Sequence, residues 1–304
     1  MGLDDSGYAW GWWVDNIKAY TCVVAPTISG NAGVPGITLS YTDGTPKTAT
    51  SKADGSYLIS VPPGWSGTVT PSHPCYTFSP SSLPYTNVTA NQTGQDYTPT
   101  FNPASGCANV DVTIGGISRG SYGIPVGGSQ RKEYALDSGP VKVSSTNTVP
   151  IIAALRDSWW DSSSSSWTSF VQLMGLPKEQ LSDTYYFPSY NNLSLSGQLR
   201  FGNVDTTATW VRVVIGGVER GRYFLNPSEQ KRVEYALDTG PVIIESETPG
   251  VKIIAALRDS WWDGRRWTSF AQLMGLPKAL LSDTYYFPSY NNLSLSGQLR
   301  FGVP

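Results

Sequence analysis

The sequence has very little of the chemistry on which most enzymes depend. Its 304 residues include one histidine and three cysteines, and only 14% of them are charged. His73, in a Ser-His-Pro turn, is the only base available to a Ser-His-Asp or Cys-His site. One histidine without a cysteine cluster also leaves a zinc site short of ligands. We therefore expect no enzyme, no metal and no cofactor.

Long apolar runs and blocks of like charge are also missing. No run approaches the roughly 20 apolar residues that cross a membrane, and the net charge is −2. We expect neither a membrane span nor a nucleic-acid partner. The N-terminus lacks the basic start and apolar core of a signal peptide, so a secretion signal would have been removed or would lie outside this sequence. Low charge with abundant Ser, Thr, Asn and Tyr is typical of secreted surface proteins.

The most prominent feature of the sequence is a long internal repeat. Residues 167–202 recur at 267–302 with only three of thirty-six positions changed, and ALRDSWWD occurs at both 154–161 and 256–263. A module of about 100 residues is therefore written twice. Stalks and fibres are routinely built this way, whereas catalytic sites rarely are. The expected domains are 1–24, 25–102, 103–206 and 207–304.

Short alternating strands between strong turn signals predict an all-β protein of tandem β-sandwiches. In residues 25–102 the turns recur about every ten residues, which is typical of an immunoglobulin-like (Ig-like) sandwich. These turns are Val34-Pro35-Gly36, Asp43-Gly44, Asp54-Gly55, Pro62-Pro63-Gly64 and Ser72-His73-Pro74.

Each repeat is expected to be a sandwich with one short helical cover. Alternating strands at 110–114 and 211–215 precede a Gly-Gly hairpin, and IIAALRDSWWD reads as a central strand. Ser169-x-x-Gln172 and Ser269-x-x-Gln272 fit a helix capping box. Phe270, Leu273 and Met274 then fall on one helical face. The connections at 162–166 and 264–266 differ while their flanks do not, as in a solvent-exposed loop tip.

Two stretches carry a resemblance to known families. GVPGITLSYTDG, ADGSYLISVPPGWSGTVTPS and YTFSP, within residues 25–102, resemble the carboxypeptidase-regulatory-like (prealbumin-like) β-sandwich found in tandem in bacterial surface proteins. That resemblance implies a structural spacer. The repeats, through YYFPSYNN and LRFG, resemble modules of large secreted proteins of filamentous bacteria such as the Chloroflexota, for which no activity is assigned.

The first 24 residues read as a strand without partners. GWWVDNIKAYTC alternates with large apolar groups on both faces, so it needs cover on both. It resembles the closing strand of a secreted jelly-roll domain whose remainder is missing. Pairing within its own chain, donation to a neighbouring subunit and a processing remnant are the open interpretations. The expected donor residues are Trp10, Trp12, Trp13, Val14, Ile17 and Tyr20.

The three cysteines are expected to form one disulfide. Cys22–Cys75 is the first expectation, with Cys107 free or paired to another subunit, and three unrelated small residues are the alternative. Four Asn-x-Ser/Thr triplets are candidate glycosylation sites. They lie at Asn87, Asn91, Asn192 and Asn292.

Carboxylate and tryptophan pairs are the remaining candidate sites. Asp157 with Asp161, and Asp259 with Asp263, are the best acid pairs for a glycosidase, but an Arg–Asp network at a strand end is the favoured interpretation. Adjacent strand residues point to opposite faces, so at most one tryptophan of each pair is expected to be exposed. The tryptophans are Trp159, Trp160, Trp261 and Trp262.

Taken together, these patterns predict an extracellular structural protein. We expect the subunit of a fimbria-like homopolymeric filament, assembled head to tail by donation of the N-terminal strand. The alternative is a carbohydrate-binding or adhesive module of a larger secreted protein, with the tryptophan pairs as a platform for sugars. The expected partners are copies of the chain itself, and glycans or other cell-surface proteins in the alternative.

Overall fold

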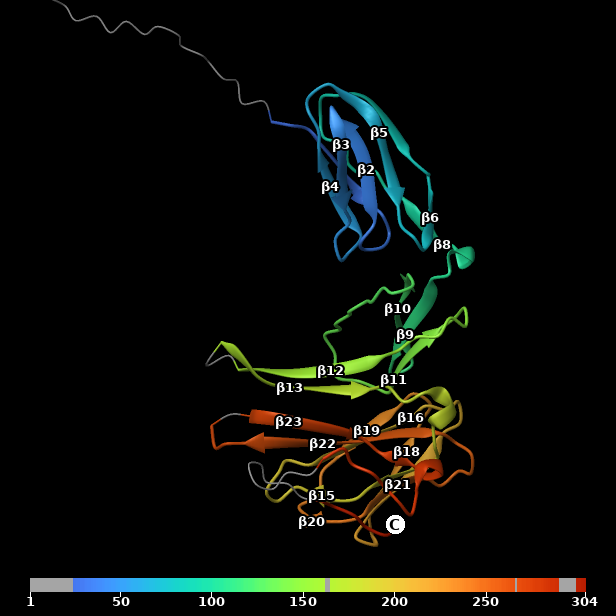
Figure 1. Ribbon diagram of the computed structural model, residues 1–304, viewed down its shortest axis with the longest axis vertical. Helices are drawn as coiled ribbons and strands as arrows, with labels where there is room; N and C mark the ends of the chain where they lie inside the picture. Colours follow the sequence, from blue (N-terminus) through green and yellow to red (C-terminus); the bar gives the residue numbers. More distant parts are fainter. Residues whose placement is uncertain (1–23, 162–164, 266, 290–298) are drawn as a thin grey trace, which may run out of the picture. The chain divides into compact units, whose positions relative to one another are not determined.

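The computed structural model describes residues 24–161, 165–265, 267–289 and 299–304. The described chain is built from β-strands, which confirms the predicted all-β class, and it contains no α-helix within these ranges. Pairings between its named strands are antiparallel, and the chain divides into two compact units, Met1–Asn102 and Pro103–Pro304 (Figure 1). Three short 3-10 turns complete the inventory, η1 (Pro103–Ser105), η2 (Lys178–Gln180) and η3 (Lys278–Leu280).

The first unit is a small sandwich in which β3-β2-β5-β7 form a four-stranded sheet and β1-β4 and β6-β8 form pairs. Positive φ at Gly36, Gly44, Gly55 and Gly64 confirms the turns read from the sequence. Its strands are β1 (Thr27–Asn31), β2 (Thr38–Asp43), β3 (Thr45–Thr50), β4 (Ser56–Ser60), β5 (Trp65–Ser72), β6 (Tyr76–Ser79), β7 (Leu83–Val88) and β8 (Thr98–Phe101).

Alternation of apolar and polar residues builds the core of this unit. In β4, Tyr57 and Ile59 are buried while Leu58 between them is exposed. Trp65 is the largest buried ring. It packs edge-on against Tyr41, and its indole nitrogen donates a 2.8 Å hydrogen bond to the carbonyl of Thr42. The buried indole thus has its polar atom satisfied.

The second unit holds both repeats. It contains the sheets β10-β9-β11, β12-β13, β18-β17-β21-β14-β24, β15-β20 and β19-β16-β22-β23. First-repeat strands are β9 (Ala108–Ile114), β10 (Ile117–Ile124), β11 (Val141–Ser145), β12 (Ala154–Asp161), β13 (Ser166–Met174), β14 (Thr184–Phe187), β15 (Tyr190–Asn191) and β16 (Gln198–Asn203). Second-repeat strands are β17 (Thr209–Ile215), β18 (Val218–Leu225), β19 (Gln230–Val233), β20 (Asp238–Thr239), β21 (Val242–Ser246), β22 (Ile253–Trp262), β23 (Trp267–Met274) and β24 (Leu276–Pro277).

One complete sandwich dominates this unit. The four-stranded and five-stranded sheets enclose a common apolar core, to which β17, β21 and β22 contribute alternate residues. The Gly216-Gly217 hairpin joins β17 to β18 with positive φ at both glycines, as predicted. β22 is central in its sheet, as predicted, whereas its first-repeat equivalent β12 pairs only with β13 among the described strands. The boundary expected at 206/207 does not separate two sandwiches, because strands from both sides share each of these sheets.

The predicted helical covers are wrong. Residues 169–172 and 269–272 lie in β13 and β23, which pair along their length with β12 and β22. Phe270 lies opposite Ser260 and Leu273 opposite Leu257 in this ladder. The cross-strand ladder and the β-forming Trp and Thr residues outweigh a weak helical periodicity. In each repeat only a three-residue 3-10 turn, η2 or η3, follows the hairpin.

Candidate functional site

The first repeat donates strands to the second. β14 and β16 come from the end of the first repeat, but each joins a sheet made of second-repeat strands (Figure 1). β14 lies between β21 and β24, with Tyr185 opposite Ile244. β16 lies between β19 and β22, with Leu199 opposite both Val233 and Leu257. The end of the first repeat therefore completes the sandwich of the second.

The donated segment, residues 184–203, fills the centre of that sandwich. Tyr185, Phe187, Leu199 and Phe201 are buried in its core. Burial raises the pKa of Tyr185 to about 12. Tyr190 is also buried, and its hydroxyl donates to the carbonyl of Gly197 at 2.8 Å and accepts from the Tyr235 amide at 2.8 Å. The segment is therefore an integral part of the core and not a surface strand.

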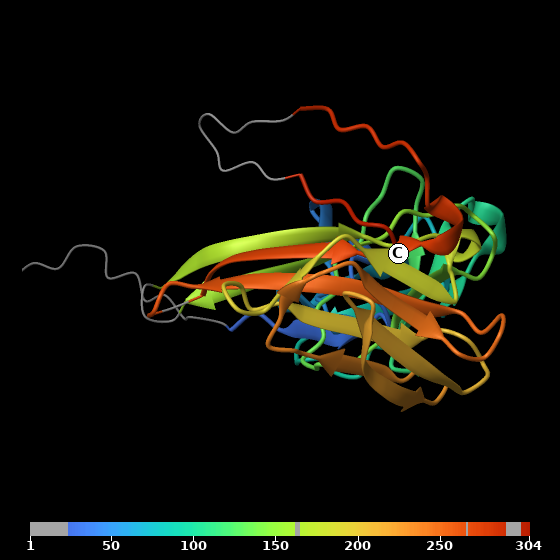
Figure 2. The same ribbon diagram turned by 90° about the horizontal axis from the view of Figure 1, so that it is seen from below.

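The second repeat ends in the same sequence, but the described part of this copy is exposed. Residues 281–302 repeat residues 181–202 without a change. Phe187 is 1% exposed, whereas its counterpart Phe287 is 69% exposed. No strand is assigned to residues 281–289 or 299–304, which together we call the terminal segment (Figure 2). Identical residues are thus buried in one repeat and solvated in the other.

The first repeat contains the matching vacancy. We call residues 108–174 the half-sandwich, because their described strands form only the sheets β10-β9-β11 and β12-β13. Val141 is 51% exposed, whereas its counterpart Val242, covered by β14, is fully buried. Leu155 is 47% exposed, against 6% for Leu257 beside β16. Within the described strands, β11 and β12 have no partner equivalent to β14 or β16.

The predicted N-terminal donor residues lie outside the described residues. Donation of this strand therefore stays a prediction. The residues concerned are Trp10, Trp12, Trp13, Val14, Ile17 and Tyr20.

Both tryptophans of each pair are partly exposed, in contrast to the expectation that one would fill the core. The four rings are between 37% and 48% exposed. A β-bulge lies beside each pair: the register shifts between Trp159 and Trp160 and again between Trp261 and Trp262, because Thr168 and Thr268 are extra residues in the facing strands β13 and β23. Trp159 packs edge-on against Phe270 of the other repeat, with ring centroids 5.9 Å apart.

The arginines beside the acid pairs stack on aromatic rings. Arg156 lies over Phe170, 5.2 Å from the ring centroid, and Arg258 lies over Phe270 at 4.3 Å. Asp259 is half-buried, one of its carboxylate oxygens has no hydrogen-bond partner, and burial raises its pKa. This environment disfavours the ionised form of Asp259 at its strand position.

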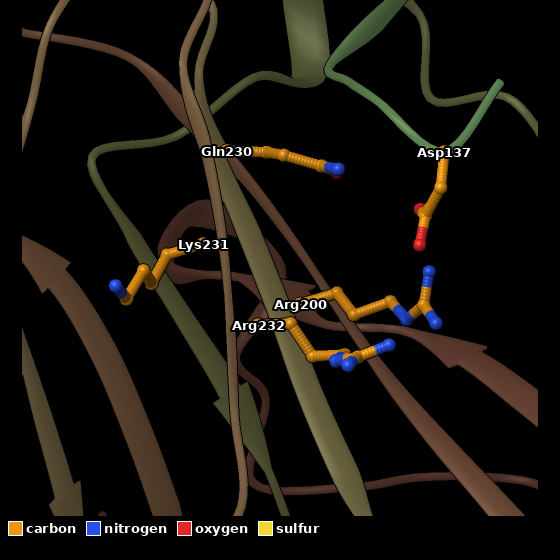
Figure 3. Close-up of a pocket in the computed structure, with 5 residues that line it drawn as sticks. All are labelled: Asp137, Arg200, Gln230, Lys231 and Arg232. Carbon is orange, nitrogen blue, oxygen red and sulfur yellow. The ribbon is translucent and has the colours of Figure 1, made fainter.

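A basic pocket that the sequence did not indicate lies on the outer face of β16 and β19. Arg200 and Arg232 are register partners there, and with Gln230, Lys231 and Asp137 they line a cavity of about 290 Å³ (Figure 3). Burial and the neighbouring Arg200 lower the pKa of Arg258, which borders an adjoining cavity. The carboxylate of Asp137 faces the Arg200 guanidinium, and the Lys231 side chain points away from both arginines (Figure 3). The sequence did contain one signal for this pocket: Arg200 alternates with Leu199 and Phe201, which places it on the face of the strand opposite to the core.

The disulfide is present, but it joins Cys75 to Cys107 and not Cys22 to Cys75. Pairing of β6 with β8 places Tyr76 opposite Phe101, and the amide of Asn102 donates to the carbonyl of Cys75 at 2.8 Å. The chain that follows Asn102 therefore starts beside Cys75, which favours Cys107 as the partner. Cys22 lies outside the described residues.

The remaining candidates are on the surface or in local structure. Asn87 and Asn91 are exposed, Asn192 is half-buried and Asn292 lies outside the described ranges, so glycosylation stays a prediction. Burial lowers the pKa of His73, whose ring accepts a 3.1 Å hydrogen bond from the Cys75 amide. The described residues contain no cluster of three or more potential metal-ligating side chains. Nor do they include a helix of the length and hydropathy required to cross a membrane.

Comparisons with known proteins identify no family. Neither a family model nor a curated sequence matches the chain. Among solved structures, a DUF3823 family protein from Bacteroides ovatus aligns over 83% of this chain and 96% of its own, with 12% identity and a TM-score of 0.24. The major pilin subunit of Bacillus cereus aligns over 82% of this chain and 67% of its own, with 8% identity and a TM-score of 0.22. Such low scores define neither the topology nor the function.

Proposed function

We propose that this chain is a subunit of an extracellular structural assembly, a fimbria-like filament in which copies are joined head to tail by donated strands. The observation that carries the proposal is the strand donation from the first repeat to the second. Residues 184–203 complete a sandwich whose other strands all come from residues 209–277. A fold that is completed by a strand from a neighbouring module extends naturally to a neighbouring subunit.

The composition and the disulfide support an extracellular site. The Cys75–Cys107 bond persists in an oxidising compartment and is rare in the cytosol. Few charged residues and abundant Ser, Thr and Asn suit a surface protein. In this proposal residues 25–102 act as a spacer and residues 10–21 as an additional, N-terminal donor strand.

Negative-stain electron microscopy of the purified chain tests the proposal. We expect filaments or oligomers whose length increases with protein concentration. A chain that stays monomeric at high micromolar concentration would contradict strand donation between copies. Deleting residues 1–21 then tests the N-terminal donor: shorter assemblies are expected, and unchanged filaments would remove that strand from the scheme.

A second function is favoured by the exposed tryptophan pairs. Rings of Trp160 and Trp262 that are nearly half exposed offer flat apolar surfaces on which sugar rings can stack. The chain would then be an adhesive or carbohydrate-binding module. Retention on a polysaccharide column is expected to be lost in the Trp160→Ala, Trp262→Ala double variant, and a glycan array without a single binder would dismiss this function.

A further inference from the structure

The described residues include a donor segment and a vacancy that fit each other but are not joined by strand pairing. The donor is the terminal segment, whose apolar residues are exposed, and the vacancy is the half-sandwich, whose β11 and β12 edges are open within the described strands. We propose that the terminal segment of one copy inserts into the half-sandwich of a second copy. This inference rests on the proposed function and names both the donor and the acceptor.

The fit follows from the register of the strand donation already described. Tyr185 lies opposite Ile244, and the equivalent residues of donor and acceptor are Tyr285 and Val143. In the same way, Leu199 lies opposite Leu257, which places Leu299 opposite Leu155. The residues that would meet are therefore specified one by one.

The sequences at these positions preserve the interaction. The donors are identical over 181–202 and 281–302, and the acceptor strand IIAALRDSWWD is identical at 151–161 and 253–263. Isoleucine 244 is replaced by Val143, a smaller residue that is also β-branched, while Val242 and Val141 are the same. The acceptor differs more at the position between them, where Lys142 replaces Ile243, the residue opposite Tyr186. The apolar residues Val141, Val143 and Leu155 of the first repeat are therefore available to an inserted segment as their counterparts are in the second repeat.

Insertion would remove two aggregation-prone surfaces together. Open edges that expose apolar residues, such as Val141 and Leu155 here, are templates for further strand pairing. Phe287, Leu299 and Phe301 of the terminal segment are even more exposed. Two extra strands would cover both sets, as β14 and β16 cover the corresponding sets in the second repeat.

The direction of the strand donation favours a second copy over the same chain. The donated segment enters the module that follows it along the chain. Among the modules of the given sequence, the vacancy that matches a donor from the second repeat is the half-sandwich of a first repeat. When that half-sandwich belongs to another copy, the contact is heterologous and open-ended. The terminal segment is exposed even though the half-sandwich of its own chain belongs to the same compact unit.

Engineered disulfides test the predicted register. In a Cys22→Ser background, which keeps the Cys75–Cys107 bond, one chain carries Val143→Cys and the other carries Tyr285→Cys. Directly opposed residues have the Cα separation that a disulfide requires. After mixing and mild oxidation, we expect at least tenfold more covalent dimer than from Val143→Cys mixed with Tyr286→Cys, which is one residue out of register.

A second cysteine pair controls for the possibility that the Val143→Cys or Tyr285→Cys substitution itself prevents insertion of the terminal segment. Leu155→Cys mixed with Leu299→Cys is expected to give the same dimer at a different position. Equal yields from matched and mismatched pairs would overturn the inference. A single chain that carries both Val143→Cys and Tyr285→Cys provides a further check. An intramolecular disulfide in the monomer would also overturn the inference, because the terminal segment would then fill the half-sandwich of its own chain.

Electron microscopy separates failure of this inference from failure of the proposed function. Filaments from the full chain without a register-specific cross-link would overturn the C-terminal donor and leave strand donation by other segments in place. Monomers without any cross-link would overturn both. Filaments that disappear when residues 283–304 are deleted, together with the matched cross-links, would support the inference.

Discussion

Phe187 and Phe287 illustrate how a residue acquires its role from its neighbours. Both follow Asp-Thr-Tyr-Tyr and precede Pro-Ser-Tyr. Phe187 is held between sheets opposite Val242, whereas Phe287 is exposed. The local sequence is the same, so the difference in burial comes from the strands that surround each copy.

This pair gives a matched test of packing. Phe187→Ala is expected to lower the free energy of unfolding of the second unit by about 3–5 kcal/mol, because it opens a cavity in the core. Phe287→Ala is expected to change the stability of the monomeric chain by less than about 0.5 kcal/mol. Urea unfolding of both variants checks the difference, and equal losses would mean that the two copies share one environment.

Asp259 predicts a pH dependence of stability. Burial raises its pKa in the folded state above the ordinary value of 3.8, so between the two values the folded chain binds more protons than the unfolded chain. Stability should therefore rise as the pH is lowered through the folded-state pKa. Asp259→Asn is expected to stabilise the chain at neutral pH and to remove this rise. Melting curves between pH 7 and pH 4 provide the measurement, and an unchanged pH profile in the variant would contradict the assignment.

At the scale of elements, β23 shows where sequence patterns are informative and where they fail. Alternation predicted β9, β17 and β22 well, because each has one clearly apolar face, and Gly-Gly marked the hairpin turns. Phe270, Leu273 and Met274 suggested a helix because short runs satisfy more than one period. Residues 267–274 form a strand because they pair with β22, and this tertiary contact cannot be read from the segment's own sequence.

The bulges at the tryptophan pairs were hidden for a similar reason. A register shift between Trp261 and Trp262 depends on how β23 aligns with β22, and no turn residue marks it. The strand donation was equally inaccessible from sequence, since the donors 181–202 and 281–302 are identical. Two identical sequences predict two identical local structures. In the structure, however, the first copy contributes β14 and β16 to the second-repeat sandwich, whereas no strand is assigned to the described part of the second copy.

The Cys75–Cys107 disulfide beside the β6–β8 pair is expected to stabilise the fold. Cys107→Ser is expected to lower the free energy of unfolding of the oxidised chain by about 2–4 kcal/mol through the lost cross-link. Cys22→Ser serves as the matched control and should leave that stability unchanged. Peptide mapping without reduction should recover Cys75 linked to Cys107. A Cys22–Cys75 peptide would contradict the pairing.

For the whole molecule, the different environments of the two identical repeat ends, residues 181–202 and 281–302, predict different protection from hydrogen exchange. In peptides that span residues 177–187, the amides of β14 should exchange slowly, because β14 is paired on both sides. Peptides that span 277–287 should exchange rapidly beyond η3 in the monomer and become protected on assembly. The two can be distinguished by mass, since Glu179-Gln180 is replaced by Ala279-Leu280. Rapid exchange of both tails would contradict the strand donation.

Because the two tails are interchangeable in sequence, we expect the order of synthesis to select which one is used. Residues 184–203 leave the ribosome before strands β17 to β23 exist, and residues 284–303 leave after them. A nascent sandwich that forms as the chain elongates captures the earlier tail, and the later tail finds the position occupied. The same chain refolded from denaturant would have no such timing, so it would divide into two topological isomers, one with donated strands and one self-contained. Vectorial translation would then explain why residues 184–203, and not their later copy, complete the sandwich.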